Sequence, residues 1–276
     1  MSIKAADVKK LRDATGAGMM DCKKALKEAG GDMDAAIEYL RKKGQKVSEQ
    51  RAERDATEGI IAVKISDDKK KAVALELNCE TDFVARNDEF IKNADRFAAL
   101  AFEKEITSAA ELGQEDVEGV TVDKALELLI GKIGEKITIN QIELLKTEGA
   151  IVSYIHPGSQ LAVLVEFADS LKNEEVGRDV AMQVAAMSPI AATRDAVDSS
   201  VLDKEREIAK EQLLNEGKPE HIAEKAAEGK LRRFYEDHVL LEQKFVKDSG
   251  MSVAEYLKQE NEPTVHSFRR VVLGNH

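Results

Sequence analysis

The chain of 276 residues is long enough for about two domains with hydrophobic cores. It is 43% hydrophobic and 34% charged, which is typical of a soluble globular protein. Its formal net charge of −11 argues against direct binding to nucleic acid, because phosphates are neutralised by clustered Lys and Arg. Residues 1–54 are an exception, with 13 Lys and Arg against 9 Asp and Glu. A solvated helix face is the favoured interpretation of this basic head, and contact with RNA or an acidic protein surface is the alternative.

Nothing in the sequence indicates a membrane or secreted protein. No apolar run approaches the roughly 20 residues that are needed to cross a bilayer. Residues 1–13 lack the continuous apolar segment of a secretory signal. Cys22 and Cys79 have no Cys or His at metal-ligand spacing nearby, so we expect two reduced thiols. These features predict a cytoplasmic protein that does not contact a membrane.

Residues 1–43 are predicted to form three short helices, because apolar side chains recur there at helical spacing between glycines. Asp32 is expected to cap the third helix, and Gly44 is expected to end it. The side chains expected to share the inner faces are Val8, Leu11, Met19, Cys22, Leu26, Met33, Ala36, Ile37 and Leu40. The charged residues 45–57 are predicted to form a helical linker.

Met19 and Met20 are adjacent, so they cannot both point into so small a core. Adaptable Met side chains are common at binding surfaces. The pattern therefore fits a partner-binding pair as well as one buried Met beside one that is incidentally exposed.

From Glu58 onward the pattern changes to β. Residues 59–66 and 71–78 predict a hairpin closed by a polar turn. A second hairpin is predicted over residues 148–167, with its turn at Pro157-Gly158. Between the two hairpins we expect helices at residues 100–106 and 122–136 and a strand at residues 137–145.

The two hairpins are copies of one another. A shift of 90 residues places Glu58-Gly59 on Glu148-Gly149, Ile61 on Ile151 and Glu76 on Glu166. In the helices that follow, the shift is 86, so the first copy is four residues longer between strand and helix. A duplicated hairpin–helix unit predicts one core in which each half covers the sheet face of the other.

The four additional residues lie within Asn78–Asp88, where Phe83 stands among acids and amides. The second copy passes from strand to helix without a counterpart of Thr81–Val84. The fold therefore does not need Phe83 in order to connect the strand to the helix. This comparison favours an exposed, partner-directed Phe83 over a core Phe83, and both alternatives stay open.

Residues 199–247 contain two long, highly charged helical patterns joined by Gly217-Lys218-Pro219. In the antiparallel helical hairpin that they predict, Ile208 and Leu213 face Ile222, Ala226 and Leu231. Two helices alone bury little apolar surface, so the hairpin is expected to dock on the core or to associate with a second copy. The chain then continues through a capping box at Ser252–Glu255 and a strand at residues 265–273.

No enzymatic chemistry is indicated. The sequence contains no phosphate-binding loop, no dinucleotide-binding glycine motif, no nucleophile elbow and no HExxH motif. Its five histidines show no metal-ligand or triad spacing, and surface positions are the simpler interpretation. We therefore expect a protein that is not an enzyme and that has neither a cofactor nor a metal site.

Several long motifs together resemble the bacterial elongation factor Ts family, in the family's order and over nearly the whole chain. They are Leu11–Leu26, Asn78–Asn87, residues 148–167, residues 181–189 and residues 217–248. The resemblance implies an α+β fold with an N-terminal three-helix ubiquitin-associated-like domain, a duplicated hairpin–helix core and an inserted antiparallel helical hairpin. The implied domains are the N-terminal domain with its linker (1–54), a core N-subdomain (55–147), a core C-subdomain (148–198 and 248–276) and a dimerisation module (199–247).

The resemblance also implies a function, which is guanine nucleotide exchange on elongation factor Tu. Such a factor binds the GDP-bound GTPase, dislocates Mg²⁺ and promotes GDP release so that GTP can bind. The residues expected to act on the Mg²⁺ side are Thr81, Asp82, Phe83 and Val84. The residues expected to dock on the partner are Arg12, Met19, Met20 and His156. Self-association through the helical hairpin is a further expectation.

An adaptor protein is the alternative class of function. The N-terminal three-helix unit alone would suit an adaptor that binds nascent chains or ubiquitin. Such an adaptor has no use for the duplicated core and its four-residue insertion, so exchange is the favoured hypothesis.

Overall fold

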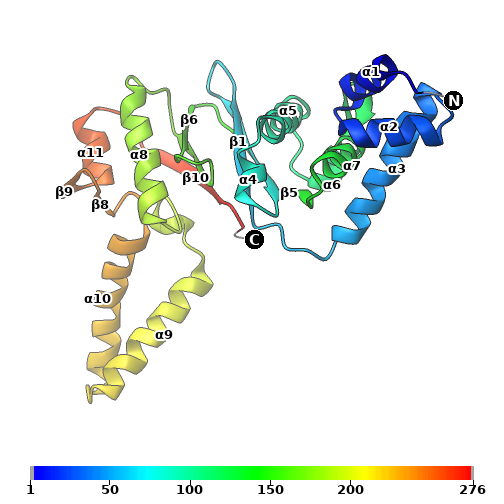
Figure 1. Ribbon diagram of the computed structural model, residues 1–276. Helices are drawn as coiled ribbons and strands as arrows, with labels where there is room; N and C mark the ends of the chain where they lie inside the picture. Colours follow the sequence, from blue (N-terminus) through cyan, green and yellow to red (C-terminus); the bar gives the residue numbers. More distant parts are fainter. Residues whose placement is uncertain (1–2, 275–276) are drawn as a thin grey trace.

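The computed structural model describes residues 3–274, and its central β layer separates two helical extensions (Figure 1). The N-terminal helices lie at one end of the molecule, and a long helical hairpin projects from the other half. The chain mixes helices and sheets, as the α+β prediction required. Among the described residues, no helix combines the length and the apolar character needed to cross a bilayer.

Three helices form the N-terminal domain, as the glycine spacing predicted: α1 (Ala5–Thr15), α2 (Met19–Glu28) and α3 (Met33–Arg51). The Asp32 side chain accepts a hydrogen bond from the Ala35 N–H at 2.8 Å, which confirms the predicted N-cap. Buried side chains from all three helices meet in a small core: Val8, Leu11, Cys22, Ala25, Leu26, Ala36 and Leu40. Met33 and Ile37 pack at its edge. The placement of Met19 on this inner face is wrong, because its side chain is 59% exposed.

The prediction that Gly44 ends the third helix is also wrong. Helix α3 continues to Arg51 and packs against α7 (Val122–Ile133). A Cβ atom at Gly44 would lie 2.5 Å from the carbonyl oxygen of Glu127, and one at Gly131 would lie 2.6 Å from the Gly44 Cα. Gly44 is therefore required by a close approach of two helix backbones, and it joins the N-terminal domain to the core.

The first half of the core is a three-stranded antiparallel sheet of order β1-β2-β5, formed by Glu58–Ile65, Lys71–Cys79 and Ile137–Lys146. Helices α5 (Asp88–Lys104) and α7 cover one face of this sheet, with Phe90 and Phe97 of α5 fully buried. The connection between these helices contains α6 (Ala109–Gln114) and a small β-ribbon of β3 (Asp116–Val117) and β4 (Val120–Thr121).

The second half repeats this plan with the strand order β10-β7-β6, formed by Val265–Val272, Leu161–Phe167 and Ala150–Ile155. Helix α8 (Glu174–Met187) covers its outer face. The remaining elements are a 3-10 turn (Arg194–Ala196), β8 (Lys244–Phe245), β9 (Asp248–Ser252) and α11 (Val253–Gln259). Helix α11 opens with the predicted capping box of Ser252 and Glu255.

The two sheets pack back to back, so the core has the layer order helix, sheet, sheet, helix (Figure 1). Between them lies a shared apolar layer of Ile61, Ala72, Ala74, Leu145, Ile151, Ala162, Leu164 and Val271. Two equivalent hydrogen bonds join the copies: Ile61 N–H donates to Ser159 and Ile151 N–H donates to Lys69, both at 2.7 Å. These bonds are related by the 90-residue shift. The duplication thus produces a pseudo-twofold interface in which each half covers the other.

The charged segment forms the predicted helical hairpin of α9 (Ser199–Asn215) and α10 (Glu220–His238). Its seam consists of Ala209 and Leu213 against Ala223 and Ala227. Ile208 and Ile222 are 42% and 44% exposed, so the prediction that they face one another in the seam is wrong. Three alanines allow the two helices to approach closely around Leu213, and Ile208 and Ile222 are left outside the seam. After α10 the chain returns to the core, where Leu240 and Phe245 are buried.

Substituting Gly44 tests the contact that joins the N-terminal domain to the core. We expect Gly44→Ala to destabilise the protein by about 1–3 kcal/mol, because the added methyl group meets the Glu127 carbonyl oxygen. Gly229→Ala in α10 is the matched control, since nothing lies within 4 Å of its added methyl group. The control should raise stability by about 0.5–1 kcal/mol through helix propensity. Urea unfolding measures both, and equal effects of the two substitutions would contradict the close contact.

Candidate functional site

The segment without a counterpart in the second copy, Thr81–Val84, supplies the N-cap and most of a single helical turn, α4 (Asp82–Ala85), between β2 and α5. Phe83 is 83% exposed, more than any other large apolar side chain of the described residues. Its neighbours hold the turn in place, since Ala85 is buried and Val84 packs against the first core. The predicted exposure of Phe83 is therefore confirmed, and its contact with a partner stays a prediction. Helix α4 holds this ring in solvent on a turn that is anchored to the core.

Asp82 precedes the ring and forms an ion pair with Arg86, at 3.0 Å across one helical turn. Its side chain is 45% exposed. An exposed pair of this kind is worth little, so Asp82 can exchange Arg86 for a new partner at small cost.

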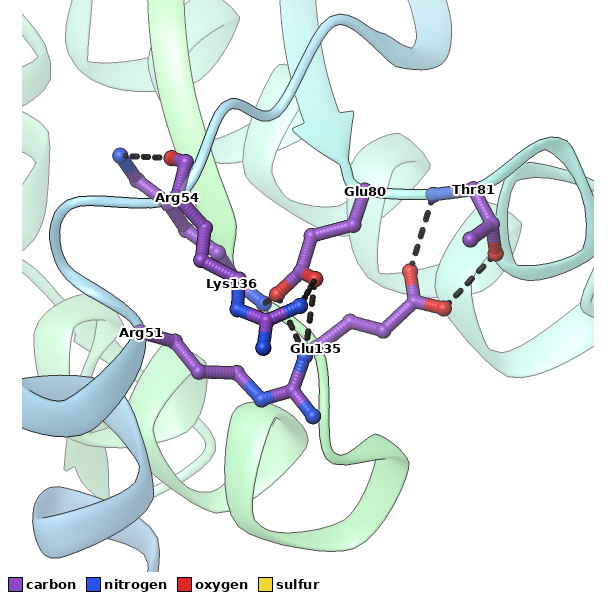
Figure 2. Close-up of polar contacts among 6 residues, drawn as sticks. All are labelled: Arg51, Arg54, Glu80, Thr81, Glu135 and Lys136. Carbon is purple, nitrogen blue, oxygen red and sulfur yellow. Dashed lines mark hydrogen bonds and ion pairs between the residues drawn. The ribbon is translucent and has the colours of Figure 1, made fainter.

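Two glutamates hold the segment that leads into α4 (Figure 2). The Glu135 carboxylate accepts hydrogen bonds from the Thr81 N–H at 3.0 Å and from the Thr81 hydroxyl at 2.7 Å. In the opposite direction, the Glu80 carboxylate accepts from the Lys136 N–H at 2.7 Å. Segments 80–81 and 135–136 are thus joined by crossed bonds, in which the carboxylate of each segment accepts from a backbone N–H of the other.

Glu80 also binds the end of α3 (Figure 2). Arg51 donates to both of its carboxylate oxygens at 2.8 Å, and Arg54 lies at 3.5 Å. The Lys136 ammonium group donates to the carbonyls of Ala52 and Arg54, both at 2.8 Å. These bonds attach the linker of the N-terminal domain to the residues that start α4.

The ionised form of Glu80 is favoured in this environment, although its side chain is only 11% exposed. Burial opposes ionisation, but hydrogen bonds from Lys136 N–H and Arg51, together with the charges of Arg51 and Arg54, outweigh it and lower the pKa of Glu80. A charged, paired carboxylate is consequently retained at neutral pH.

Cys79 lies beneath the same segment and is fully buried. Burial, followed by the nearby charge of Glu135, raises the pKa of its thiol to about 12. The thiol donates to the Thr81 carbonyl at 3.2 Å. Cys79 is therefore a neutral packing residue and not a nucleophile, in line with the expected reduced thiol.

The structure gathers three of the predicted docking residues at one end of the N-terminal domain. Met19 and Met20 open α2 and are 59% and 75% exposed. Arg12 is exposed in the last turn of α1. Gly16, in a left-handed conformation with φ 67°, closes α1 and brings the two helix ends together.

His156 is exposed in the turn between β6 and β7, and its Nδ1 lies 3.0 Å from the Tyr154 hydroxyl. Gln160 of the same turn donates to Glu58 at 3.4 Å, and Glu58 is paired with Cys79. His156 therefore lies at the end of the β layer from which α4 emerges, although it belongs to the other copy.

The sequence indicated Thr81–Val84 but not the glutamates that hold them. Glu80 lies within Asn78–Asp88, and its partners are 26 to 56 residues away in the chain. No local periodicity predicts such pairings. Among the residues that the structure describes, no group of three His, Cys, Asp or Glu side chains could hold a metal ion.

Comparison with known proteins identifies relatives along nearly the whole chain. A family model described as Elongation factor TS matches residues 80–275. A protein named Elongation factor Ts from Prosthecochloris aestuarii is 51% identical over 265 residues, which cover 93% of this chain and 92% of the relative. Another from Christiangramia forsetii is 49% identical over 274 residues, with 99% of both chains covered. A third, from Amoebophilus asiaticus, is 46% identical over 278 residues, covering 99% of this chain and all of the relative.

Substitutions of Phe83 and Phe90 compare the stability contribution of an exposed ring with that of a buried ring in the same region. We expect Phe83→Ala to leave the melting temperature nearly unchanged, because the 83% exposed ring contributes little buried area. Phe90→Ala, at a fully buried position of α5, should destabilise the protein by about 3–5 kcal/mol. Thermal unfolding followed by circular dichroism compares them. If Phe83→Ala lowered the melting temperature as much as Phe90→Ala, Phe83 would be a core residue.

Proposed function

Because the chain belongs to the elongation factor Ts family, we propose that it is a guanine nucleotide exchange factor for elongation factor Tu. It binds the GDP-bound GTPase, dislocates Mg²⁺ and promotes GDP release, so that GTP can bind. The observation that carries the proposal is Phe83, presented at 83% exposure on a turn that the second copy lacks. An apolar ring held in solvent on an anchored turn is suited to insertion into another protein.

The proposed mechanism follows from how a GTPase holds GDP. Backbone amides and a Lys surround the phosphates, and Mg²⁺ is bound by hydroxyl and phosphate oxygens. An exchange factor must bind the nucleotide-free GTPase more tightly than the GDP form, because only differential affinity shifts an equilibrium. The coupling is reciprocal, so GDP weakens the binding of the factor by the same ratio.

Residues Thr81–Val84 perform the proposed dislocation. Phe83 enters between elements of the GTPase on the Mg²⁺ side. Asp82 brings a carboxylate to the polar network that holds the ion, and releases Arg86 as it does so. Thr81 and Val84 fix the two ends of this short turn on the core of the factor.

Arg12, Met19, Met20 and His156 provide the proposed docking contacts. The two exposed Met side chains supply an adaptable apolar surface. Arg12 adds a positive charge beside them, and His156 contributes from the second copy. We assign the N-terminal domain of residues 1–54, ubiquitin-associated-like in this proposal, mainly to docking.

Exchange of this kind requires no bond-making chemistry, no cofactor and no metal in the factor itself. The protein is accordingly proposed not to be an enzyme and to work in the cytoplasm, without membrane or direct nucleic-acid contact. Its partner is a translation GTPase.

Two double substitutions separate docking from dislocation, with release of a fluorescent GDP analogue from elongation factor Tu as the assay. Met19→Ala with Met20→Ala should raise the concentration for half-maximal exchange and leave the saturating rate close to wild type. Contacts made equally in both nucleotide states change binding only. Asp82→Ala with Phe83→Ala should lower the saturating rate even when complex formation is complete.

Chelation of Mg²⁺ provides an internal control in the same assay. It should restore part of the rate lost by the Asp82 and Phe83 variant and little of the deficit of the Met19 and Met20 variant. If both variants lose only affinity, the two groups are parts of one docking surface and the division is wrong. If the wild-type chain does not accelerate GDP release, the proposed function itself fails.

We also propose that the helical hairpin of residues 199–247 mediates self-association. The exposed Ile208, Leu214 and Ile222 support this, since the hairpin's own seam does not use them. Replacing Ser199–His238 by a short flexible linker should leave a folded core of lower oligomeric state. Light scattering measures the mass of the particle, and an unchanged number of subunits would count against this role.

A further inference from the structure

We infer that Glu135 and Glu80 are positioning residues for exchange: they fix the direction in which Asp82 and Phe83 leave the surface and join that turn rigidly to the docking domain. This inference rests on the proposed function. It concerns two side chains that lie beneath the presented residues and that need not touch the partner.

Helix α4 cannot hold a direction by itself. It has four residues, and its backbone bonds from Ala85 to Thr81 and from Arg86 to Asp82 are both 3.2 Å long. An isolated turn of this length is unstable in water, because the first turn fixes many dihedral angles for few hydrogen bonds. The orientation of Phe83 must therefore come from contacts outside the turn.

Thr81 supplies such contacts at the start of the turn. It occupies the N-cap position, where a Thr hydroxyl usually binds a free N–H of its own helix. No such cap bond is present, and both the hydroxyl and the N–H of Thr81 donate to Glu135 instead. The N-cap residue of α4 is thus held by two hydrogen bonds to a single carboxylate.

Glu135 is itself placed by the end of α7. Gly134 adopts a left-handed conformation with φ 83° and closes that helix through its N–H bond to Ile130. Glu135 and Lys136 follow directly and lead into β5. Since α7 also packs on Gly44 of α3, one rigid helix supports both the docking domain and Glu135.

Glu80 completes the connection from the other side. It binds the Lys136 N–H, and it receives both hydrogen bonds from Arg51 at the end of α3. The largely buried carboxylate of Glu80 consequently fixes the N-terminal domain to the segment that starts α4. Movement of α3 relative to α4 would break these bonds.

The second copy offers a comparison within the same chain. There Glu262 accepts hydrogen bonds from the N–H groups of Lys172 and Asn173 at 2.9 and 2.8 Å, so a carboxylate again holds the connection between strand and helix. The residue at the shifted position of Glu80 is Ser170, and no presented ring follows it. The two crossed glutamates, Glu80 and Glu135, are therefore found in the copy that contains Phe83.

The test uses the full-length chain and GDP release from elongation factor Tu, measured over a range of factor concentrations. Glu135→Ala should lower the saturating rate by about thirtyfold, which corresponds to two hydrogen bonds of average net strength, with little change in the half-saturating concentration. Glu135→Gln should retain most of the rate. Its amide oxygen can accept from the Thr81 N–H, and its amide nitrogen can donate to the Thr81 hydroxyl oxygen.

Glu80 should respond differently to the same replacement. In Glu80→Gln the amide nitrogen would face the donors of Arg51 and Arg54. The conservative variant should therefore lose exchange activity as Glu80→Ala does. Both Glu80→Ala and Glu80→Gln should raise the half-saturating concentration and lower the saturating rate, because the N-terminal domain is no longer fixed to the segment that starts α4.

Two controls separate positioning from general destabilisation. Glu262→Ala breaks the corresponding bonds of the second copy and should lower the melting temperature without changing the saturating rate. Adding Glu135→Ala to the Asp82→Ala and Phe83→Ala variant should make that variant no slower, because Glu135 acts through those two side chains. Should Glu135→Ala fold poorly, Thr81→Val removes only the hydroxyl donor and should give a smaller loss of the saturating rate.

Two results would overturn the inference while leaving the proposed function intact. One is a wild-type saturating rate for Glu135→Ala, and the other is a further, multiplicative loss when Glu135→Ala is added to the Asp82→Ala and Phe83→Ala variant. A wild-type chain that does not accelerate GDP release would instead remove the proposed function and this inference together.

Discussion

The crossed hydrogen bonds between segments 80–81 and 135–136 are the constraint on which the arrangement of this protein depends. A buried carboxylate is tolerated only when it is paired and hydrogen-bonded, and Glu80 meets this condition through Arg51 and the Lys136 N–H. The partners come from α3, from the end of β2 and from the entry to β5. One small polar centre therefore sets the relation between the N-terminal domain, the first sheet and α4.

The duplicated core provides the rigid support for this centre. Two sheets share one apolar layer, and equivalent backbone bonds at Ile61 and Ile151 fix their register. The two halves differ in the connection from strand to helix: the first carries the turn that presents Phe83, and the second passes directly into α8. The second half still contributes His156, from a turn at the same end of the β layer. In the proposed exchange reaction, contacts from both copies and from the N-terminal domain act on one partner.

Sequence patterns predicted the features that depend on short-range order. Glycines and apolar spacing located the N-terminal helices, and comparison of the chain with itself indicated an exposed Phe83. Three of the failures have one cause, which is close packing between separate elements of the chain. Gly44 looked like a helix end because its contact with Gly131 is invisible locally. Ile208 and Ile222 were assigned to a seam that alanines occupy. Glu135 was missed because its partner Thr81 lies 54 residues away.

Amide hydrogen exchange of Thr81 and Lys136, followed by NMR, tests the central claim most directly. Neither N–H bonds a backbone carbonyl in a helix or sheet, since each donates to a glutamate side chain. If the crossed pair holds the start of α4, both amides will be protected in the free protein. In Glu135→Ala the Thr81 amide will lose its protection, whereas amides in the buried stretch around Phe97 will keep theirs. Rapid exchange of Thr81 in the wild-type chain would contradict the claim, because α4 would then lack a fixed direction.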